Sequence, residues 1–297
     1  MKTPRSIGTH DGTFHADEVT ACALLIVFDM GDRDKILRSR DVEKLAACDF
    51  LCDVGGIYDP SLKCFDHHQA SFTGHLSSAG MILKYCHEMK VISQEMFFHL
   101  NQSLILGIDA HDNGQLMHEV GVCTFSAVIA NYNPTTYDAS PEELDCAFHK
   151  ALDFAIDYLQ SSIGHFNYRI ACRQDVKEAM NKAKKCLIFD HSLPWLESFF
   201  AIGGAHHPAL FIIMPVGKNW KLRAIPPDYD HSMEVRLPLP KSWAGLLGNE
   251  LKKKSGIEGA IFCHKGRFIS VWETREDAIE ALKQVFKDNN IKYEDAF

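Results

Sequence analysis

The sequence of 297 residues lacks several features that would point at once to a class of protein. It contains no run of about 18 apolar residues, so we expect no helix that crosses a membrane. None of its ten cysteines belongs to a C-x-x-C pair, which argues against a zinc site or a disulfide framework built from cysteine. Internal repeats and low-complexity tracts are also missing.

Acidic residues outnumber basic ones. The chain has 31 lysines and arginines against 39 acidic residues, which gives a net charge of −8. A protein that coats DNA without regard to sequence would instead be basic. A substrate that carries phosphate stays compatible with this charge, because bound divalent cations would reverse the local sign of an acidic site.

The remaining composition is that of an ordinary globular protein, with 46% hydrophobic and 24% charged residues. The length favours two domains over one. A strand-like run, RSIGTH, begins close to Met1 and leaves no room for a signal peptide or a typical transit sequence. We therefore expect the protein in the cytosol or nucleus. A mitochondrial location and the oligomeric state are left open.

Short apolar runs alternate with helical patterns in the first half of the chain, as in SIGTH followed by DEVTACALLIVF. This alternation is typical of an α/β fold with a mostly parallel sheet. Long helical patterns follow up to about Lys185, and strand-like runs such as PALFIIMPV and WKLRAI come after them. We predict a first domain over residues 1–185, connector helices included, and a smaller α/β domain over residues 186–297.

Three of the buried-strand candidates end in histidine or aspartate. In an open parallel sheet, ligands bind outside the carboxyl ends of the strands, so such residues would share one edge. The loop after the first strand adds a histidine and an aspartate. A fourth segment, GIDAHDNG, offers Asp109 or Asp112. The strand and loop candidates are His10, His15, Asp17, Asp53, Asp66, His67 and His68.

Imidazoles and carboxylates without cysteine suit Mn²⁺ or Mg²⁺ better than structural zinc. Two such ions about 3.5–4 Å apart need a bridging ligand, which a carboxylate can be. Asp53 is the best candidate because Gly55 and Gly56 remove bulk just after it. A pair of ions there would deprotonate a water and stabilise charge on a phosphoryl group under attack. A polar loop is the alternative interpretation of each motif taken alone.

The ordered motifs resemble those of the DHH phosphoesterase superfamily. The longer strings GTHDGTFHADE, RSRD, DVGGIYDP, FDHHQASF and IDAHDNG resemble one branch, the eukaryotic melanocyte proliferating gene protein family of 3′-to-5′ RNA exonucleases. The resemblance extends from about Ile7 to about Leu282. It implies a metal-binding DHH domain and a smaller C-terminal domain that closes over the substrate.

The resemblance also implies roles for single residues. Asp53 would bridge the metals, and Asp109 would be the ligand from the fourth segment. His68 would contact the phosphate or donate a proton, and Asp66 would orient a histidine from behind. His15 would stand in for the acid of the superfamily's first motif, which is Phe14 here by position. The other implied metal ligands are His10, Asp17 and His67.

Four further residues are weaker candidates for contacts with the substrate. Ser78 opens a predicted helix, so its backbone amide either holds a phosphate or serves only the helix start. Arg236 and His264 match family strings in the second domain, where a phosphate contact and a structural salt bridge are equally plausible. Arg40 either reaches the same edge or caps a helix. The string Ser270-Val271-Trp272 stands where the branch has a glycine pair.

Three functions therefore stay open. The first is a Mn²⁺- or Mg²⁺-dependent phosphodiesterase that shortens RNA or oligonucleotides from one end. The second is a phosphatase for a small nucleotide or for pyrophosphate. The third is a metal-binding interaction protein without catalysis.

Overall fold

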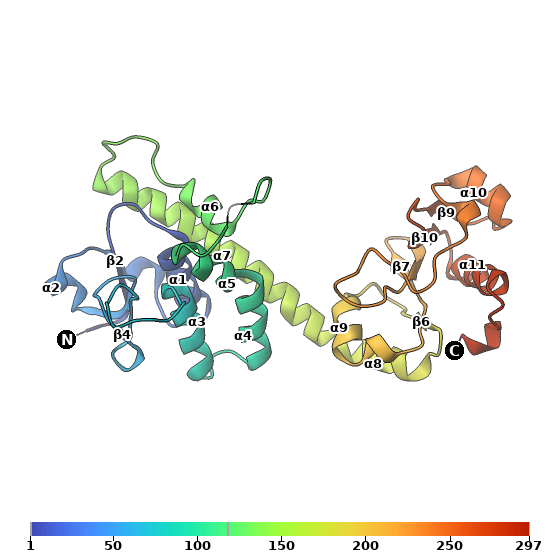
Figure 1. Cartoon of the computed structure of the whole chain (residues 1–297), viewed down its shortest axis with the longest axis horizontal. Coiled ribbons are helices and arrows are strands. Elements are labelled where there is room, and N and C mark those ends of the chain that lie inside the picture. Colours follow the sequence, from blue (N-terminus) through green and yellow to red (C-terminus); the bar gives the residue numbers. More distant parts are fainter. Residues whose placement is uncertain (1, 118, 297) are drawn as a thin grey trace. The chain divides into compact units, whose positions relative to one another are not determined.

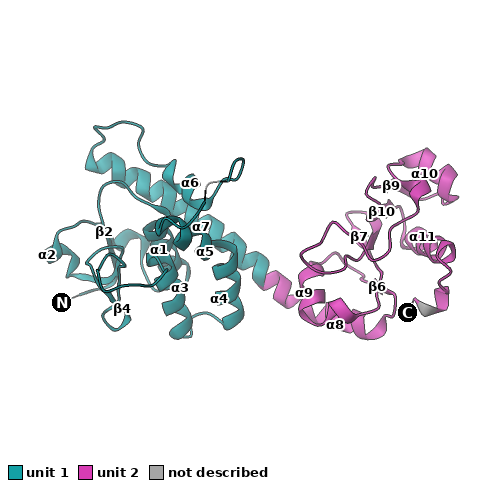
Figure 2. Cartoon of the chain, viewed as in Figure 1, with its two compact units in different colours: residues 1–166 teal, residues 167–297 magenta. Residues whose placement is uncertain are grey.

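The computed structural model describes residues 2–117 and 119–296. The chain divides into two compact units, residues 1–166 and residues 167–297 (Figure 2). The division falls inside helix α7 (Pro141–Ala171). A functional boundary after residue 185 stays a prediction.

The first unit contains a sheet with strand order β2-β1-β3-β5-β4, five strands among the described residues. Neighbouring strands are parallel except for the β4–β5 pair. The predicted α/β class with a mostly parallel N-terminal sheet is confirmed. Its strands are β1 (Thr3–Thr9), β2 (Ile36–Arg38), β3 (Cys48–Cys52), β4 (Tyr58–Asp59) and β5 (Cys64–Phe65).

Helices α1, α3 and α5 pack against one another beside this sheet (Figure 1). A π-helical turn at Asn101–Ile105 joins α4 to α5. The helices of the first unit besides α7 are α1 (Ala16–Val27), α2 (Val42–Leu45), α3 (Ser78–Glu88), α4 (Gln94–Leu100), α5 (Leu106–Asp112) and α6 (Phe125–Ala130).

Helix α1 forms where the sequence predicts a helical pattern. Val19, Cys22 and Ala23 recur at helical spacing and are fully buried. At its start, the backbone N–H of His15 donates to the Glu18 carboxylate at 2.8 Å. The carboxylate three residues into the helix thus satisfies the chain just before it, as in a capping box.

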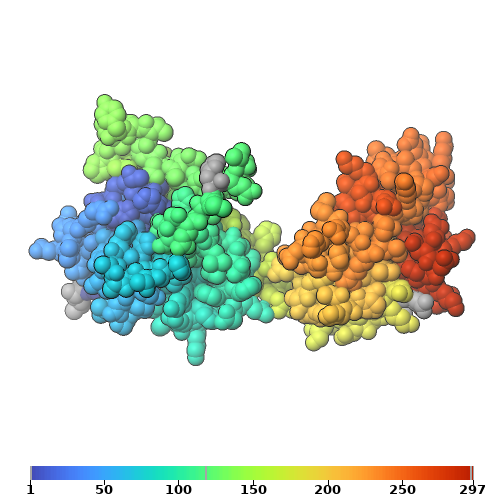
Figure 3. All heavy atoms as spheres, in the orientation of Figure 1, coloured from blue at the N-terminus to red at the C-terminus, as the bar shows by residue number. Residues whose placement is uncertain are grey.

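The segment between α5 and α6 carries apolar side chains that do not join the core. It projects from the first unit in the space-filling view, in green (Figure 3). Met117 is 89% exposed and Val120 is 90% exposed. No described helix is both long and apolar enough to cross a membrane.

The second unit is built on a sheet with strand order β6-β7-β8-β10-β9, again five strands among the described residues. Strands β6 and β7 are parallel, and the other pairs are antiparallel. The strands are β6 (Cys186–Ile188), β7 (Phe211–Val216), β8 (Asn219–Ala224), β9 (Ala260–Cys263) and β10 (Ile269–Trp272). The helices are α8 (Arg173–Lys182), α9 (Leu196–Ala201), α10 (Gly248–Ser255) and α11 (Arg275–Asp288).

Each face of this second sheet has a core of its own. Ile213 belongs to the cluster that includes residues of α10 and α11. Its neighbour Ile212 belongs to the cluster that includes residues of α8 and α9. Adjacent residues of a strand face opposite sides, so β7 contributes to both layers. The N-cap of helix α11 is Thr274, whose hydroxyl accepts from the Asp277 N–H at 3.1 Å.

Candidate metal centre

The carboxyl ends of three parallel strands deliver the candidate ligands to one edge of the first sheet. His10 follows β1, Asp53 follows β3 and Asp66 follows β5. Because β1, β3 and β5 run parallel in adjacent positions, these residues lie at the same end of the sheet. Asp53 has φ of +54°, and this left-handed residue turns the chain as it leaves β3.

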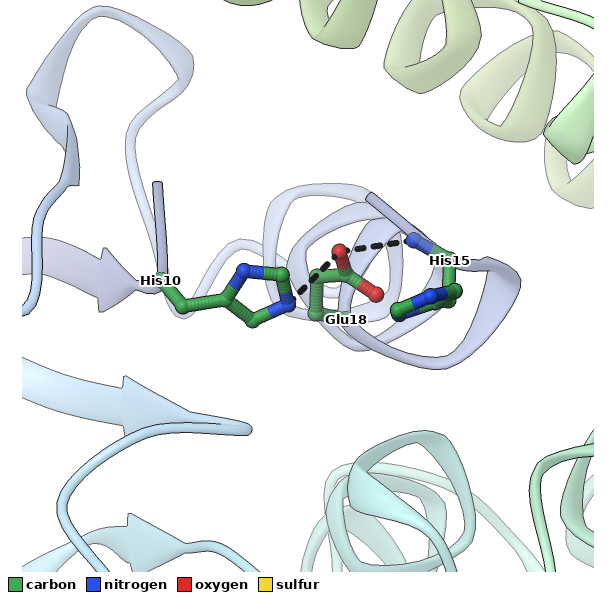
Figure 4. Close-up of side chains that lie close together, drawn as sticks. All are labelled: His10, His15 and Glu18. Carbon is green, nitrogen blue, oxygen red and sulfur yellow. Dashed lines mark hydrogen bonds and ion pairs between the residues drawn. The ribbon is translucent and has the colours of Figure 1, made fainter. Parts of the chain in front are cut away.

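Glu18, near the start of α1, contacts the first of these histidines (Figure 4). Its Oε1 atom lies 3.1 Å from Nε2 of His10, and its side chain lies between the rings of His10 and His15. Glu18 is fully buried. It is not among the residues predicted from the sequence. Its place three residues after His15 in a capping-box pattern is a signal that could have found it.

Asp53 occupies the middle of the cluster. Its Oδ2 atom lies 3.4 Å from Nε2 of His10. Its Oδ1 atom lies 3.5 Å from Nε2 of His67 and 3.4 Å from Nδ1 of His68. The carboxylate is 5% exposed. One buried aspartate therefore reaches imidazoles from two different strand ends, which is the position that a bridging ligand requires.

The two aspartates of α5 have different partners. Asp112 Oδ2 lies 3.0 Å from Nε2 of His67. Asp109 Oδ1 instead accepts from the backbone N–H and the hydroxyl of Ser77, at 2.9 and 2.7 Å. Asp109 is buried, and its partner Ser77 is the N-cap of α3. The structure thus brings Asp112, rather than Asp109, into contact with the predicted ligand His67.

The adjacent histidines of the FDHHQ string also differ. The His67 side chain is 12% exposed and the His68 side chain is 64% exposed. Asp66 Oδ1 lies 2.7 Å from Nδ1 of His68, and Asp66 Oδ2 accepts from the Gly56 N–H at 2.6 Å. Asp66 therefore fixes His68 and the glycine turn, while His68 faces the solvent side of the site.

The cluster holds carboxylate oxygens that no donor satisfies. Both carboxylate oxygens of Asp17 and Oε2 of Glu18 are buried without a hydrogen-bond partner among the described residues. An unpaired buried carboxylate is costly, and a divalent cation removes that cost. The residues present fit such a cation. Ligand atoms within 4.8 Å of one another occur in the sets Asp53–His67–His68, Asp17–His67–Asp112, Asp17–Glu18–Asp53 and His10–His15–Glu18.

The ionisation of these groups reflects their crowding. Burial raises the pKa of Asp17 well above its usual range, and the neighbouring carboxylates of Glu18 and Asp53 raise it further. The carboxylates of Asp112 and Asp53 raise the pKa of His67 to about 10. Burial opposes protonation of His10, but hydrogen bonds to Asp53 and Glu18 raise its pKa to about 10. Without a metal, protons therefore neutralise much of the negative charge.

An open cleft of about 730 Å³ lies over the cluster. His10, His15, Asp53, His67 and His68 are among its lining residues. Arg40 is the only lysine or arginine among the described residues that line it. Its Nε atom lies 3.5 Å from Asp11 Oδ1, and the side chain is 68% exposed. The exposed guanidinium is therefore paired with Asp11 and lines the cleft.

The other predicted substrate contacts are not among the residues that line this cleft. Ser78 is fully buried at the first residue of α3. In the second unit, the Arg236 guanidinium donates to the backbone carbonyls of His207 and Gly204 at 2.6 and 2.7 Å. His264 Nδ1 accepts from the Gly266 N–H at 3.0 Å. Arg236 thus contacts carbonyl oxygens, and no carboxylate among the described residues forms an ion pair with it.

The Ser270-Val271-Trp272 string contributes to the core of the second unit. The indole N–H of Trp272 donates to the Ser270 hydroxyl at 2.9 Å, and both residues are fully buried. Trp272 also packs against Trp243, with ring centroids 5.6 Å apart. The side chains of Ser270 and Trp272 therefore pack inside the second unit, at the string where the resemblance implies a glycine pair.

Comparisons with known proteins place this chain in a family. A family model described as "Uncharacterised protein family (UPF0160)", with the model name MYG1_exonuc, matches residues 6–285. The MYG1 protein of Chlamydia muridarum is 52% identical over 291 residues, which cover 98% of this chain and 100% of the relative. The human MYG1 exonuclease is 32% identical over 325 residues, covering 95% and 86% of the two chains.

Solved structures of the exonuclease RecJ bound to manganese also match. The protein from Thermus thermophilus is 12% identical. The match covers 96% of this chain and 52% of the RecJ chain, with a TM-score of 0.28. A second RecJ structure is 13% identical, covers 75% and 78% of the two chains, and gives a TM-score of 0.26. With identities and TM-scores this low, nothing about the present chain is concluded from the RecJ structures. The family model and the relatives, bacterial and mammalian, confirm the predicted family, and the chain belongs to the family of MYG1 proteins described as UPF0160.

Proposed function

We propose that this protein is a metal-dependent phosphoesterase that hydrolyses RNA or short oligonucleotides from the 3′ end. One observation carries the proposal: the buried carboxylate of Asp53 lies within 3.5 Å of imidazole nitrogens of His10, His67 and His68 at the edge of an open cleft. The name MYG1 exonuclease, given to mammalian relatives, supports the same class of reaction.

The first unit's own residues would hold two divalent ions, Mn²⁺ or Mg²⁺. Asp53 lies between two groups of ligand atoms, so it is the proposed bridge. When bound, the ions would act as Lewis acids and lower the pKa of a water. Asp112 is the proposed ligand from α5, because its carboxylate contacts His67. The proposed ligands are His10, Asp17, Asp53, His67 and Asp112, with His15 and Glu18 beside them.

His68 would act on the substrate. Asp66 holds its Nδ1 atom at 2.7 Å, which fixes the ring and leaves Nε2 for the cleft. From there it can contact a phosphate oxygen or donate a proton to the leaving oxygen. The Arg40 guanidinium, on the same cleft, can hold a second phosphate oxygen.

A phosphatase for small nucleotides or pyrophosphate is the second candidate. It is favoured by the scarcity of positive charge, since Arg40 is the only lysine or arginine among the described residues lining the cleft. A site that holds a long strand through its backbone would be expected to offer several cations.

The experiment compares these functions directly. The purified full chain is incubated with Mn²⁺ and either a 5′-labelled RNA or a panel of small phosphate compounds. Stepwise shortening of the RNA from the 3′ end is the expected result. Release of phosphate from the small compounds alone would establish the second candidate. Metal binding with no turnover on any of them would leave a non-catalytic metal-binding protein.

A further inference from the structure

Two cations project from one face of β8 in the second unit. Lys221 and Arg223 alternate along the strand with Leu222 and Ala224. Leu222 and Ala224 are fully buried in the core that includes residues of α11. Successive side chains of a strand face opposite sides of the sheet, so the two cations lie on the other face. They are about 6.6 Å apart along the strand.

No carboxylate in the described part of the chain forms an ion pair with either cation. Across the sheet, Lys221 pairs with Met214 and Val271. Arg223 pairs with apolar residues as well, Ile212 on β7 and Ile269 on β10. The Nε atom of Arg223 is buried without a hydrogen-bond partner among the described residues. Arg223 thus meets apolar neighbours where a charged partner would be expected.

A pocket of about 330 Å³ opens at these side chains. Glu197 is the only carboxylate among the described residues that line it, and its Oε2 atom lies 3.1 Å from Nη1 of Arg169. Glu197 and Arg169 neutralise each other. The net charge of the lining is therefore positive, and it comes from Lys221 and Arg223. Burial lowers the pKa of Lys221, and the charge of Arg223 lowers it further. An anion in the pocket would favour the charged form of Lys221 and so oppose both effects.

An aromatic side chain stands at the same pocket. Tyr229 lines it and is 49% exposed, so part of the side chain is accessible to a ligand. Two acids flank it in sequence, Asp228 and Asp230, and the Asp228 carboxylate is held by His231 at 2.8 Å. Cations that meet the backbone, together with an exposed aromatic ring on which a base can stack, form the usual combination for binding single-stranded nucleic acid.

We propose that Lys221 and Arg223 bind the phosphate backbone of a single-stranded oligonucleotide in the pocket of the second unit, with Tyr229 beside a base. The inference rests on the proposed function for the choice of ligand. The spacing of the two cations lets them contact either one phosphate from two sides or two neighbouring phosphates. Arg223 also lies 5.9 Å from the ring centroids of Trp195 and Phe268, which keep the guanidinium in place.

The test measures binding of a fluorescein-labelled oligonucleotide of about 10 nucleotides to the full chain in EDTA, by fluorescence anisotropy at several salt concentrations. The double variant Lys221→Gln/Arg223→Gln should bind roughly tenfold more weakly. Its plot of log K against log salt should flatten by about 0.7 for each phosphate that the variant no longer neutralises. Arg223→Lys alone keeps the charge and should keep most of the wild-type affinity. Thermal unfolding checks that each variant is folded.

The matched control is Lys287→Gln/Lys292→Gln. It removes the same net charge from exposed residues of α11 and the chain just after it, and it should keep the wild-type affinity. Equal losses in both double variants, or none in the first, would overturn the proposal. Displacement of the oligonucleotide by equimolar inorganic phosphate would also overturn it, in favour of a site for a free phosphate group. Because no metal is present, failure of hydrolysis in the earlier experiment has no bearing on this result.

Discussion

His67 and Asp112 join two segments that are far apart in the sequence, with Nε2 of the histidine 3.0 Å from Oδ2 of the aspartate. His67 lies just after β5, and Asp112 is the last residue of α5. The contact closes the candidate metal centre on the side of the helices. It also distinguishes Asp112 from Asp109, which lies one helical turn earlier and bonds to Ser77.

The two aspartates of α5 should therefore respond differently to substitution. Asp112→Asn removes a charge beside His67, so the affinity for Mn²⁺ should fall by about 10- to 100-fold. Asp109→Asn weakens charge-assisted hydrogen bonds to Ser77 at the start of α3, so the free energy of unfolding should fall by about 1.5–3 kcal/mol. Titration calorimetry and urea unfolding measure the two quantities. The opposite assignment of effects would make Asp109 the ligand.

Substitution of Asp53 by asparagine should abolish hydrolysis. Asparagine tolerates the left-handed backbone at φ +54°, so the turn after β3 should be kept while the charge is lost. We expect activity to fall by about 1,000-fold with little change in melting temperature. Asp34→Asn, an exposed acid of the same unit, is the control for the lost charge. Full activity of Asp53→Asn would exclude the proposed two-metal mechanism.

His68→Ala should separate turnover from metal binding. The side chain is 64% exposed and held by Asp66, so it is placed to meet substrate more than to hold a metal. The kcat should fall by about 100-fold or more, and the affinity for Mn²⁺ should change by less than about threefold. His165→Ala, an exposed histidine of α7, serves as control. A parallel loss of metal affinity and kcat would instead identify His68 as a ligand.

The metal-free protein should lose stability as the pH rises above neutrality. His10 and His67 both have pKa values raised to about 10, from an ordinary value of 6.5. The folded state thus favours their protonated forms, and this stabilisation is complete below about pH 6.5 and lost as the pH approaches 10. In EDTA, the free energy of unfolding should fall by at least about 1 kcal/mol between pH 7 and 10.

The same pH range should act oppositely on metal binding. Metal ligands must be deprotonated, so the affinity for Mg²⁺ should rise between pH 7 and 9 and binding should release protons. Calorimetry in buffers with different ionisation enthalpies measures that release.

The control for the loss of stability at high pH is His67→Asn, which should flatten the pH dependence of unfolding in EDTA. An unchanged pH dependence in this variant would mean that other groups cause it.

Gly80→Ala should destabilise the first unit. A Cβ atom at this position would collide with Oδ2 of Asp109 and lie 2.7 Å from its Oδ1. The carboxylate is buried and bonded to Ser77, so it has little room to withdraw. We expect a loss of about 1–3 kcal/mol in urea unfolding. Gly107→Ala on α5, where a Cβ would meet nothing within 4 Å, should be neutral or slightly stabilising.

The sequence predicted the parts of the site that depend on strand ends. Parallel strands place their carboxyl ends at one edge, so His10, Asp53 and the Asp66-His67-His68 string were expected together without knowledge of the packing. The structure brings them together in that way. Glu18 was not predicted, because a glutamate in the first turn of a helix more often serves the helix start alone.

What the sequence by itself determined was the α/β class, the order of the motifs and the family, since periodicity and strings of residues are local. The tertiary structure alone decided which acid of α5 meets His67, because Asp109 and Asp112 lie on neighbouring turns and only the packing of α5 against α1 and α3 fixes its rotation. It also decided that Arg236 contacts carbonyl oxygens while Lys221 and Arg223 have no acidic partner among the described residues. A side chain's partner depends on which strands and helices become neighbours, and no local pattern carries that information.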